Sequence, residues 1–278
     1  MKHLMLPDGV QLSLRDAGQG HPLLMLHGWS QSAAMFRYQI EEFSRVTRVL
    51  APDLRGHGLS DKPAFGYRIA SLARDVNELL DQLGVDCADM LGWSMGASVL
   101  WSFIDLFGSR RIRKLVLVDE PACVVQLPGM SANEIAEAGA IVDLAGLQSL
   151  IAGLLGPESL AVRRAFLDGM LSKHPTEETR QWLMDESLKM PPAYAAALLL
   201  DHATQDWRDL IPRIDVPTLV VGGESSHVNP QSQKWIASQI RASRLEIIPA
   251  ADRGSHFPFI ENPALFNRLV GEFLGLRC

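Results

Sequence analysis

The sequence predicts an α/β fold with a mostly parallel sheet of eight strands between layers of helices. Apolar runs with the length of buried strands alternate with helical stretches along most of the chain, which is typical of a parallel sheet covered on both faces. At the N-terminus, two apolar runs are separated by a turn at Asp8 and Gly9, so an antiparallel hairpin is expected at one sheet edge. The alternation stops once, between residues 122 and 210, where only helical patterns occur.

The expected strands follow one another along the chain. The hairpin consists of HLMLP (3–7) and VQLSLRD (10–16). The six later runs are PLLMLHG (22–28), RVLAPD (48–53), ADMLGW (88–93), KLVLVDE (114–120), PTLVVGG (217–223) and LEIIPA (245–250). Helices are expected between them, for example at 71–84 and 231–240, because apolar residues recur there at helical spacing.

A helical insertion is expected between the sixth and seventh strands, so that residues 1–121 and 211–278 form the core and residues 122–210 a cap. Its helical patterns, with no good strand among them, cover 133–155, 159–171, 178–189 and 193–203. A segment inserted here leaves and re-enters the sheet at the C-terminal ends of strands, where parallel sheets bind ligands. We therefore expect the cap to cover a ligand site and to govern the length and bulk of the substrate.

The composition favours a small-molecule partner. The net charge is −6 and Lys and Arg form no run, so neither a nucleic-acid surface nor a polybasic membrane patch is expected. No stretch approaches the roughly 18 uncharged apolar residues of a membrane span. Asp8 and Arg15 interrupt the N-terminal segment before a signal-peptide core could form, which predicts a cytoplasmic protein. No feature specifies an oligomeric state.

The cysteines indicate neither a metal site nor a disulfide framework. Cys87, Cys123 and Cys278 are an odd number at unrelated spacings, with no CxxC pair and no His/Cys cluster. We therefore expect reduced thiols and no zinc.

The stretch GWSMGAS (92–98) contains the candidate nucleophile, Ser94. Gly92 and Gly96 remove the side chains that would collide where a strand turns directly into a helix, so the serine is pushed out at the tip of the turn. The start of that helix leaves free backbone N–H groups, including that of Met95, which can face a developing negative charge.

Of the eight histidines, His256 is the candidate base because of its position in the chain. His256 follows the last predicted strand, on a loop with Gly254 and Pro258 from which it can reach over the sheet edge toward Ser94. Structural roles fit the others better: His57 is expected to order a loop, and His202 and His227 to be hydrogen-bonded partners or cap residues. A second oxyanion donor is the N–H of Trp29, because Gly28 lets this strand end approach the Ser94 turn closely.

Four motifs, HGW, DLRGHGLSDKP, GWSMGAS and GSHFPFIENP, resemble the α/β-hydrolase superfamily in order and separation, over essentially the whole chain. The resemblance implies the α/β-hydrolase fold, Ser94 as nucleophile, His256 as base, the Trp29 and Met95 amides as the oxyanion hole, and no cofactor. Within the superfamily, the chain is most similar to small-molecule esterases and cofactor-free haloperoxidases.

The third member of a catalytic triad departs from the superfamily pattern. The usual acid follows the strand before the last, but Ser226 stands at that place in GGESSHVNP, and Glu224 is two residues out of register. The other known location, the end of the strand after the nucleophile helix, holds Asp119 and keeps the chain order Ser, Asp, His. We expect an Asp119 oxygen within about 3.2 Å of His256 Nδ1. Glu120 should point elsewhere, toward the cap junction or the pocket wall.

These residues predict a serine hydrolase that acts on a small, apolar or aromatic ester or other activated carbonyl. A rival resemblance is to the cofactor-free dioxygenases that cleave 3-hydroxy-4-quinolone rings. There, His256 would deprotonate the substrate hydroxyl and the anion would react with O2, leaving Ser94 to position the substrate. A non-catalytic receptor is a third alternative, against which the complete Ser, His and acid set argues.

Aromatic and methionine residues of the cap and the core are candidates for the acyl pocket. They are Trp29, Phe36, Met95, Trp182, Met190 and Trp207. Such residues at helical spacing are more often packing residues, so their role depends on which way each helix faces.

Overall fold

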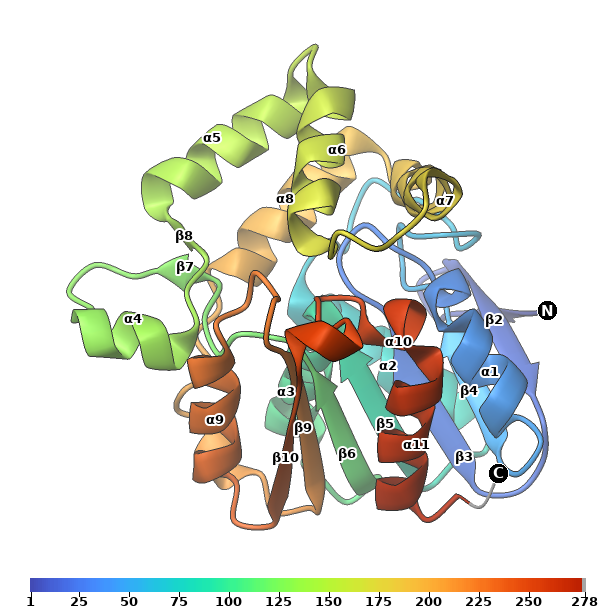
Figure 1. The fold of residues 1–278 in the computed structure, drawn as a ribbon. Coiled ribbons are helices and arrows are strands. Elements are labelled where there is room, and N and C mark those ends of the chain that lie inside the picture. The colour runs from blue at the N-terminus through green and yellow to red at the C-terminus, as the bar shows by residue number, and fades with distance from the viewer. Residues whose placement is uncertain (277–278) are drawn as a thin grey trace.

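An eight-stranded sheet forms the centre of the computed structural model, which describes residues 1–276 (Figure 1). The strand order is β1-β2-β4-β3-β5-β6-β9-β10. The strands are β1 (Lys2–Met5), β2 (Gln11–Ala17), β3 (Pro22–Leu26), β4 (Arg48–Pro52), β5 (Ala88–Trp93), β6 (Ile112–Val118), β9 (Thr218–Gly223) and β10 (Ser243–Ile248). Only β2 runs against its neighbours, so the predicted edge hairpin and the mostly parallel sheet are both confirmed.

Helices cover both faces of the sheet. One face carries α2 (Ile69–Gln82), α3 (Met95–Phe107), the 3₁₀ turn η2 (Ile211–Arg213) and α9 (Pro230–Gln239). The other carries η1 (Ala33–Phe36), α1 (Arg37–Phe43), α10 (Pro258–Glu261) and α11 (Pro263–Leu274), and the turn η3 (Ala250–Asp252) follows β10. Met90 and Leu91, consecutive in β5, pack into opposite layers and are fully buried. Burial on both sides explains why the central strands are continuous apolar runs without alternation.

The segment between β6 and β9 lies mainly above the C-terminal ends of the strands (Figure 1). It comprises β7 (Val125–Gln126), α4 (Ala132–Ala138), β8 (Val142–Asp143), α5 (Leu144–Leu155), α6 (Ser159–Met170), α7 (Glu177–Leu188) and α8 (Pro192–Ala203). Helices α5 to α8 are raised above the sheet, whereas α4 lies beside α9.

Two short strands correct the expectation of an all-helical insertion with an unbroken pattern over 133–155. Helix α4 ends at Gly139, which has a left-handed φ of 77°, and β7 pairs with β8 before α5 begins. A Cβ at Gly139 would lie 2.5 Å from Ser232 Oγ, so a glycine is needed where the chain passes α9. Apolar periodicity continues across this break because both helices bury one face, and the pattern alone therefore missed it.

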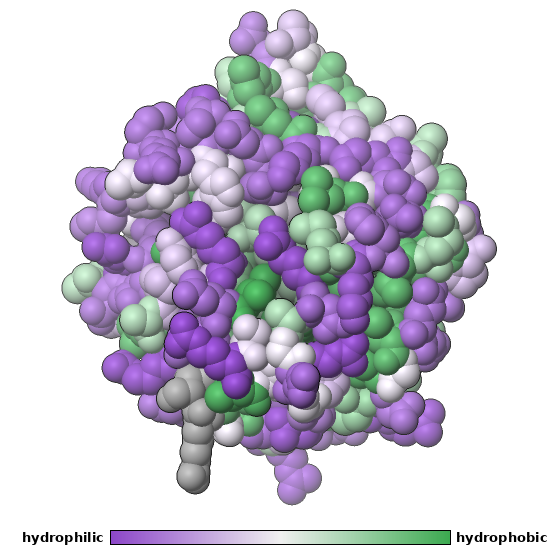
Figure 2. All heavy atoms as spheres, turned by 90° about the vertical axis from the view of Figure 1, so that its right-hand side faces the viewer, coloured by the Kyte–Doolittle hydropathy of each residue, from purple (hydrophilic) through white to green (hydrophobic). Residues whose placement is uncertain are grey.

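The surface is mixed. Figure 2 shows polar and apolar residues interspersed on the face that lies to the right in Figure 1. Within residues 1–276, the helices are all too short or too polar to cross a membrane. Cys87 and Cys123 are free thiols, the second of them buried, and Cys278 lies outside the described residues.

The start of α3 packs directly on the end of β3. A Cβ at Gly96 would lie 2.2 Å from the carbonyl oxygen of Leu26, and one at Gly92 would lie 2.5 Å from the carbonyl oxygen of Gly96. Both distances are far below van der Waals contact. The two glycines of the GWSMG stretch therefore allow strand and helix to meet without a gap.

We expect Gly96→Ala to lower the free energy of unfolding by about 3 kcal/mol, because the backbone of β3 would have to move. Gly169→Ala in α6 is the matched control, since nothing lies within 4 Å of the added Cβ, and it should leave stability unchanged or slightly higher. Urea denaturation of both variants measures the difference. Equal midpoints would contradict the close contact.

Candidate active site

Ser94 occupies a strained turn between β5 and α3. Its backbone has φ 52° and ψ −132°, a conformation that side-chain-bearing residues adopt only when their surroundings impose it. Its N–H donates to the carbonyl of Val118 (2.9 Å), and its carbonyl accepts from the N–H of Ala97 (2.7 Å). These bonds hold the turn, and Ser94 lines a cavity above the strand ends.

His256 and Asp119 are in direct contact, as predicted. His256 Nδ1 lies 2.7 Å from Asp119 Oδ2, and both side chains are buried. The loop after β10 is fixed there because Trp93 Nε1 donates to the carbonyl of His256 (2.9 Å). Asp119 directly follows β6 and has a positive φ of 52°, and its N–H donates to Val221 (2.8 Å). The backbone therefore aims the carboxylate at the imidazole.

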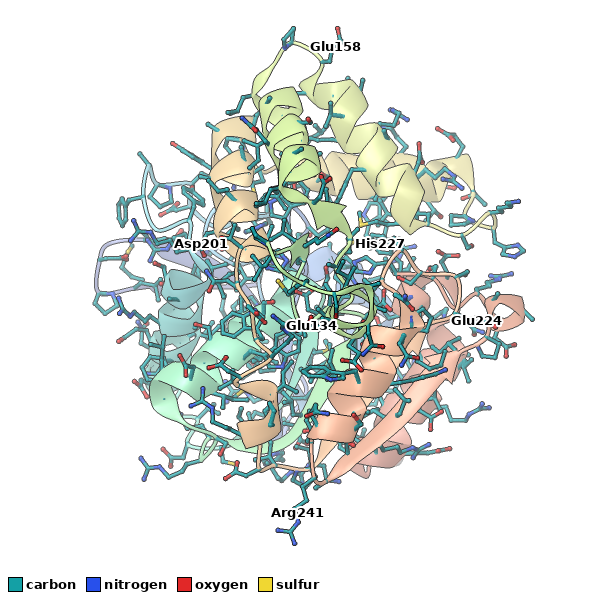
Figure 3. The ribbon with its side chains drawn as sticks, turned by 90° about the vertical axis from the view of Figure 1, so that its left-hand side faces the viewer. Glu134, Glu158, Asp201, Glu224, His227 and Arg241 are labelled. Carbon is teal, nitrogen blue, oxygen red and sulfur yellow. The ribbon has the colours of Figure 1, made fainter. Side chains whose placement is uncertain are left out.

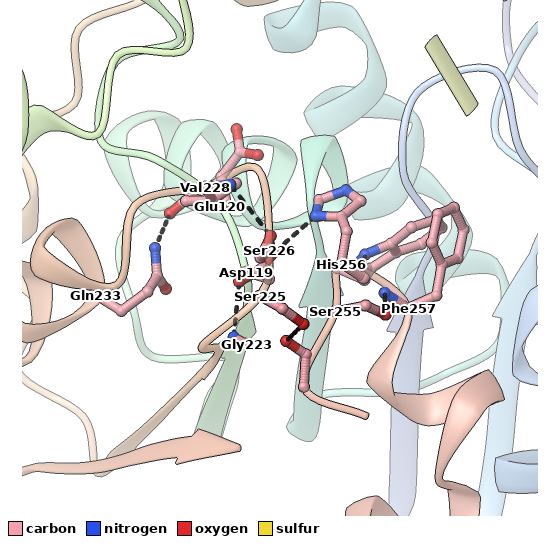
Figure 4. A network of polar contacts seen from close by, with 12 residues as sticks. Asp119, Glu120, Gly223, Ser225, Ser226, Val228, Gln233, Ser255, His256 and Phe257 are labelled. Atoms are coloured by element: carbon pink, nitrogen blue, oxygen red, sulfur yellow. Dashed lines mark hydrogen bonds and ion pairs between the residues drawn. The ribbon is translucent and has the colours of Figure 1, made fainter. Parts of the chain in front are cut away.

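Two further groups donate to the Asp119 carboxylate. The N–H of Gly223 donates to Oδ1 (3.1 Å), and the hydroxyl of Ser226 donates to Oδ2 (Figure 4). Ser226 Oγ in turn accepts from the N–H of Val228 (3.1 Å). Ser226 stands where the superfamily usually has its acid. Its hydroxyl instead forms a hydrogen bond with the Asp119 carboxylate, which comes from the neighbouring strand β6. The sequence showed that an acid was missing here but not what replaces its contact.

Glu224 is turned away from this pair. Its Oε2 accepts the N–H of Ala250 (2.7 Å), and the side chain is exposed. Figure 3 shows Glu224 at the outside of the molecule and His227 between the core and the insertion. Of the two carboxylates considered from the sequence, the structure brings only Asp119 to His256.

The backbone N–H groups of Trp29 and Met95 are available as donors. Within residues 1–276, neither donates a hydrogen bond. A Cβ at Gly28 would lie 3.1 Å from Ser94 Cβ, so the loop after β3 lies against the nucleophile turn. Met95 is the first residue of α3, where N–H groups carry partial positive charge.

Two buried histidines order the loop that carries Trp29. His27 Nε2 accepts from the N–H of Leu54 (3.0 Å), so its Nδ1 carries the proton donated to the carbonyl of Gly28 (2.9 Å). His57 Nε2 accepts from the N–H of Ser30 (3.2 Å), in agreement with its expected loop-ordering role. Burial lowers the pKa of both imidazoles and thereby favours the neutral rings that these bonds require.

A cavity of about 50 Å³ lies next to Ser94 and His256. Its walls come from the core and from the insertion, whose contribution is mainly apolar. The lining residues of the insertion are Val124, Ile141, Phe166, Met170, Leu199 and His202. Trp29 joins the two parts, since its ring packs edge-on against Phe166 and its Nε1 donates to the carbonyl of Ala195 in α8 (2.9 Å).

Of the residues proposed from the sequence for the acyl pocket, Trp29 lines this cavity. Four others do not, which corrects that expectation. They are Phe36, Trp182, Met190 and Trp207. Phe36 packs against Phe259 beneath the sheet, and Trp207 packs against Trp101. Trp182 lies under the guanidinium of Arg37, and Met190 is buried in the core. Their side chains pack away from the cavity, and its aromatic walls are Trp29, Trp93 and Phe166.

A second group of buried polar side chains lines the cavity. Glu120 Oε1 accepts from the hydroxyl of Ser98 (2.7 Å) and lies 3.4 Å from His202 Nε2. Burial raises the pKa of Glu120 to about 8 and lowers that of His202 to about 4, so both are mainly neutral near pH 7. Glu120 thus forms part of the pocket wall, as expected.

His227 lies beside the candidate base. Its ring is edge-on to that of His256, with centroids 4.4 Å apart. Burial lowers its pKa well below the ordinary value, with a further contribution from His256. Its neutral ring therefore adds no charge next to His256. Among residues 1–276, no cluster of three or more His, Cys, Asp and Glu side chains could hold a metal ion.

We expect Glu120→Gln to change how stability depends on pH. The folded-state pKa of about 8 is above the ordinary 4.5, so the contribution of the protonated group is complete below about 4.5 and is lost as pH rises through about 8. Between about pH 5 and pH 8.5, the wild type should therefore lose about 2 kcal/mol or more of unfolding free energy relative to the variant. Urea denaturation at both pH values tests this, and a difference independent of pH would contradict it.

Comparisons with known proteins agree with this architecture. The family model for the alpha/beta hydrolase fold matches residues 21–263. The AB hydrolase superfamily protein YisY of Bacillus subtilis is 29% identical, over 98% of each chain. Pimeloyl-[acyl-carrier protein] methyl ester esterase of Aeromonas hydrophila is 27% identical, over 96% of this chain and 100% of its own. The solved structure of an esterase from Exiguobacterium antarcticum covers 99% of both chains at 26% identity, with a TM-score of 0.89. The chain is therefore a member of the alpha/beta hydrolase fold family.

Proposed function

We propose that the protein is a serine hydrolase that cleaves small, apolar or aromatic esters, or other activated carbonyls, with Ser94, His256 and Asp119 as its triad. The observation that carries this proposal is the buried 2.7 Å contact between His256 Nδ1 and Asp119. It places an oriented imidazole in the same cavity as the strained Ser94 turn. A nucleophile, a base and an oriented acid in one cavity are the components that acyl transfer needs.

In this mechanism, the Ser94 hydroxyl attacks the substrate carbonyl while His256 Nε2 accepts its proton. Asp119 holds the other proton on Nδ1 and stabilises the imidazolium. The N–H groups of Trp29 and Met95 donate to the oxyanion of the tetrahedral intermediate. His256 then gives its proton to the leaving alcohol, and an acyl-enzyme remains. Water, deprotonated by His256, attacks the acyl-enzyme and releases the acid.

The cavity and the relatives support this substrate class. The side chains that the insertion adds are mostly apolar, which favours uncharged acyl groups over ionic ones. The relatives named as esterases align over nearly the full chain. Residues 122–210 act as the cap of this site in our proposal, because four of their segments contribute walls to the cavity.

The first test is the activity of Ser94→Ala on a panel of p-nitrophenyl esters. Hydrolysis should fall by about 10⁴-fold or more, because the nucleophile is lost and only binding and oxyanion contacts remain. Circular dichroism of the variant controls for folding. Unchanged turnover would exclude the serine hydrolase assignment.

The same panel, extended to 3-hydroxy-4-quinolones with and without oxygen, tests the rival function. Consumption of a quinolone only in air, with His256→Ala far more damaging than Ser94→Ala, would replace the hydrolase proposal by the dioxygenase. That chemistry would use the same His256–Asp119 pair.

The second test separates the two carboxylates. Asp119→Asn should lower kcat/KM for the best ester by about 10⁴-fold, because an amide can impose the wrong imidazole tautomer and cannot stabilise the imidazolium. Glu224→Gln, the matched control, should change it by less than about twofold, since Glu224 contacts only an exposed backbone amide. Comparable losses in both variants would show that Asp119 is not the acid.

A further inference from the structure

Glu120, His202 and Ser98 form a buried polar cluster that the proposed triad does not use. They come from three elements: Ser98 from α3, Glu120 from the residue after Asp119, and His202 from α8. All three side chains are at most 5% exposed. Burying three polar groups together in a mainly apolar pocket is unfavourable unless their hydrogen bonds are satisfied. The cluster therefore needs a physical explanation.

The cluster lies close to the reacting atom. Glu120 and His202 line the same cavity as Ser94. In Figure 4, the carboxyl group of Glu120 points away from the sheet, and it does not take part in the network around Asp119. A substrate attached to Ser94 would thus share its cavity with Glu120 and His202.

Two polar atoms of the cluster lack a protein partner. Within residues 1–276, Glu120 Oε2 makes no hydrogen bond, and His202 Nδ1 is buried without one. Ser98 and the Nε2 atom of His202 both face Glu120 Oε1, so Oε2 is the oxygen that carries the proton of the neutral acid. If His202 Nε2–H faces Oε1, its Nδ1 is an acceptor. The cluster then offers one donor and one acceptor, which is the complement of a hydroxyl group.

The acyl side of the substrate is the part that meets this cluster. The leaving group must lie beside His256, which protonates it. Ser98 donates to Glu120 from α3, the helix whose first N–H is the proposed oxyanion donor. With the leaving group beside His256, the acyl chain is the part of the substrate that we assign to Glu120 and His202.

We propose that Glu120 and His202 form a subsite that hydrogen-bonds a hydroxyl group on the acyl chain, so that the preferred substrates are esters of short hydroxy acids. This inference rests on the proposed hydrolase function and narrows its substrate class. A hydroxyl group both donates to His202 Nδ1 and accepts from Glu120, whereas a methyl group of similar size leaves both polar atoms unsatisfied. Sites built to bind a hydroxyl group reject the apolar analogue for this reason.

The test compares methyl 3-hydroxybutyrate with methyl 3-methylbutyrate, which differ by a hydroxyl in place of a methyl group. Wild-type kcat/KM should favour the hydroxy ester by about tenfold or more. Glu120→Gln keeps a donor and the shape, so it should retain most of the preference. Glu120→Leu and His202→Phe should each reduce it to about threefold or less. Two independent variants guard against a failure of either one to fold.

Binding to Ser94→Ala separates this inference from the proposed function. Ligand-observed NMR should show that the inactive variant binds the hydroxy ester more tightly than the methyl analogue, and that Glu120→Leu in the same background removes the difference. This result would support the subsite even if the wild type hydrolysed neither ester, an outcome that would refute the hydrolase instead. Equal binding of the two esters, or a preference that survives both Glu120→Leu and His202→Phe, would overturn the subsite.

Discussion

Three neighbouring parallel strands are followed by side-chain-bearing residues with a positive φ, and the proposed site depends on this constraint. Ser30 lies four residues beyond β3, whereas Ser94 directly follows β5 and Asp119 directly follows β6, with φ values of 54°, 52° and 52°. Each such residue costs about 1–3 kcal/mol of strain. The N–H of each is held by a hydrogen bond, to His57, Val118 and Val221 respectively. The sheet thereby imposes the sharp turns that bring the loop with Trp29, Ser94 and Asp119 to one edge.

Consecutive carboxyl groups at the end of β6 have different environments. Asp119 accepts from a backbone amide, a serine hydroxyl and an imidazole, so three hydrogen bonds stabilise its carboxylate. Glu120 has one hydroxyl donor, Ser98, and burial raises its pKa to about 8. Adjacent positions in the chain can differ in this way because side chains at a strand end point to opposite sides. One acid is thus suited to hold charge and the next to remain neutral.

The sequence was sufficient for the sheet and for the placement of the principal site residues. The contact between Asp119 and His256 was expected because the superfamily resemblance offered the end of β6 as a second location for the acid, and because β6 was expected beside β5. The roles of these residues in catalysis stay predictions. The contact of Ser226 with Asp119 could not be foreseen. The absence of an acidic residue at position 226 does not show what the residue there contacts instead.

The pocket was the part that sequence patterns described least well. Helical periodicity identifies the side of a helix that avoids water, but packing layers and cavity walls are both apolar. Trp207 and Phe166 have equivalent signals in the sequence, yet only Phe166 faces the cavity. The same limitation hid the break at Gly139, where two helices with a common buried face are separated by a left-handed residue.

Trp29 lies in the core part of the sequence, but its side chain contacts the insertion. Its indole donates to α8 and packs on α6, while the preceding residue, Gly28, lies against the Ser94 turn. The insertion is consequently not a module that could be exchanged between members of this family independently of the core. A different set of helices would leave the indole without its acceptor and would disturb the peptide that carries the proposed oxyanion donor. Replacing these helices would therefore require a matching change at residue 29.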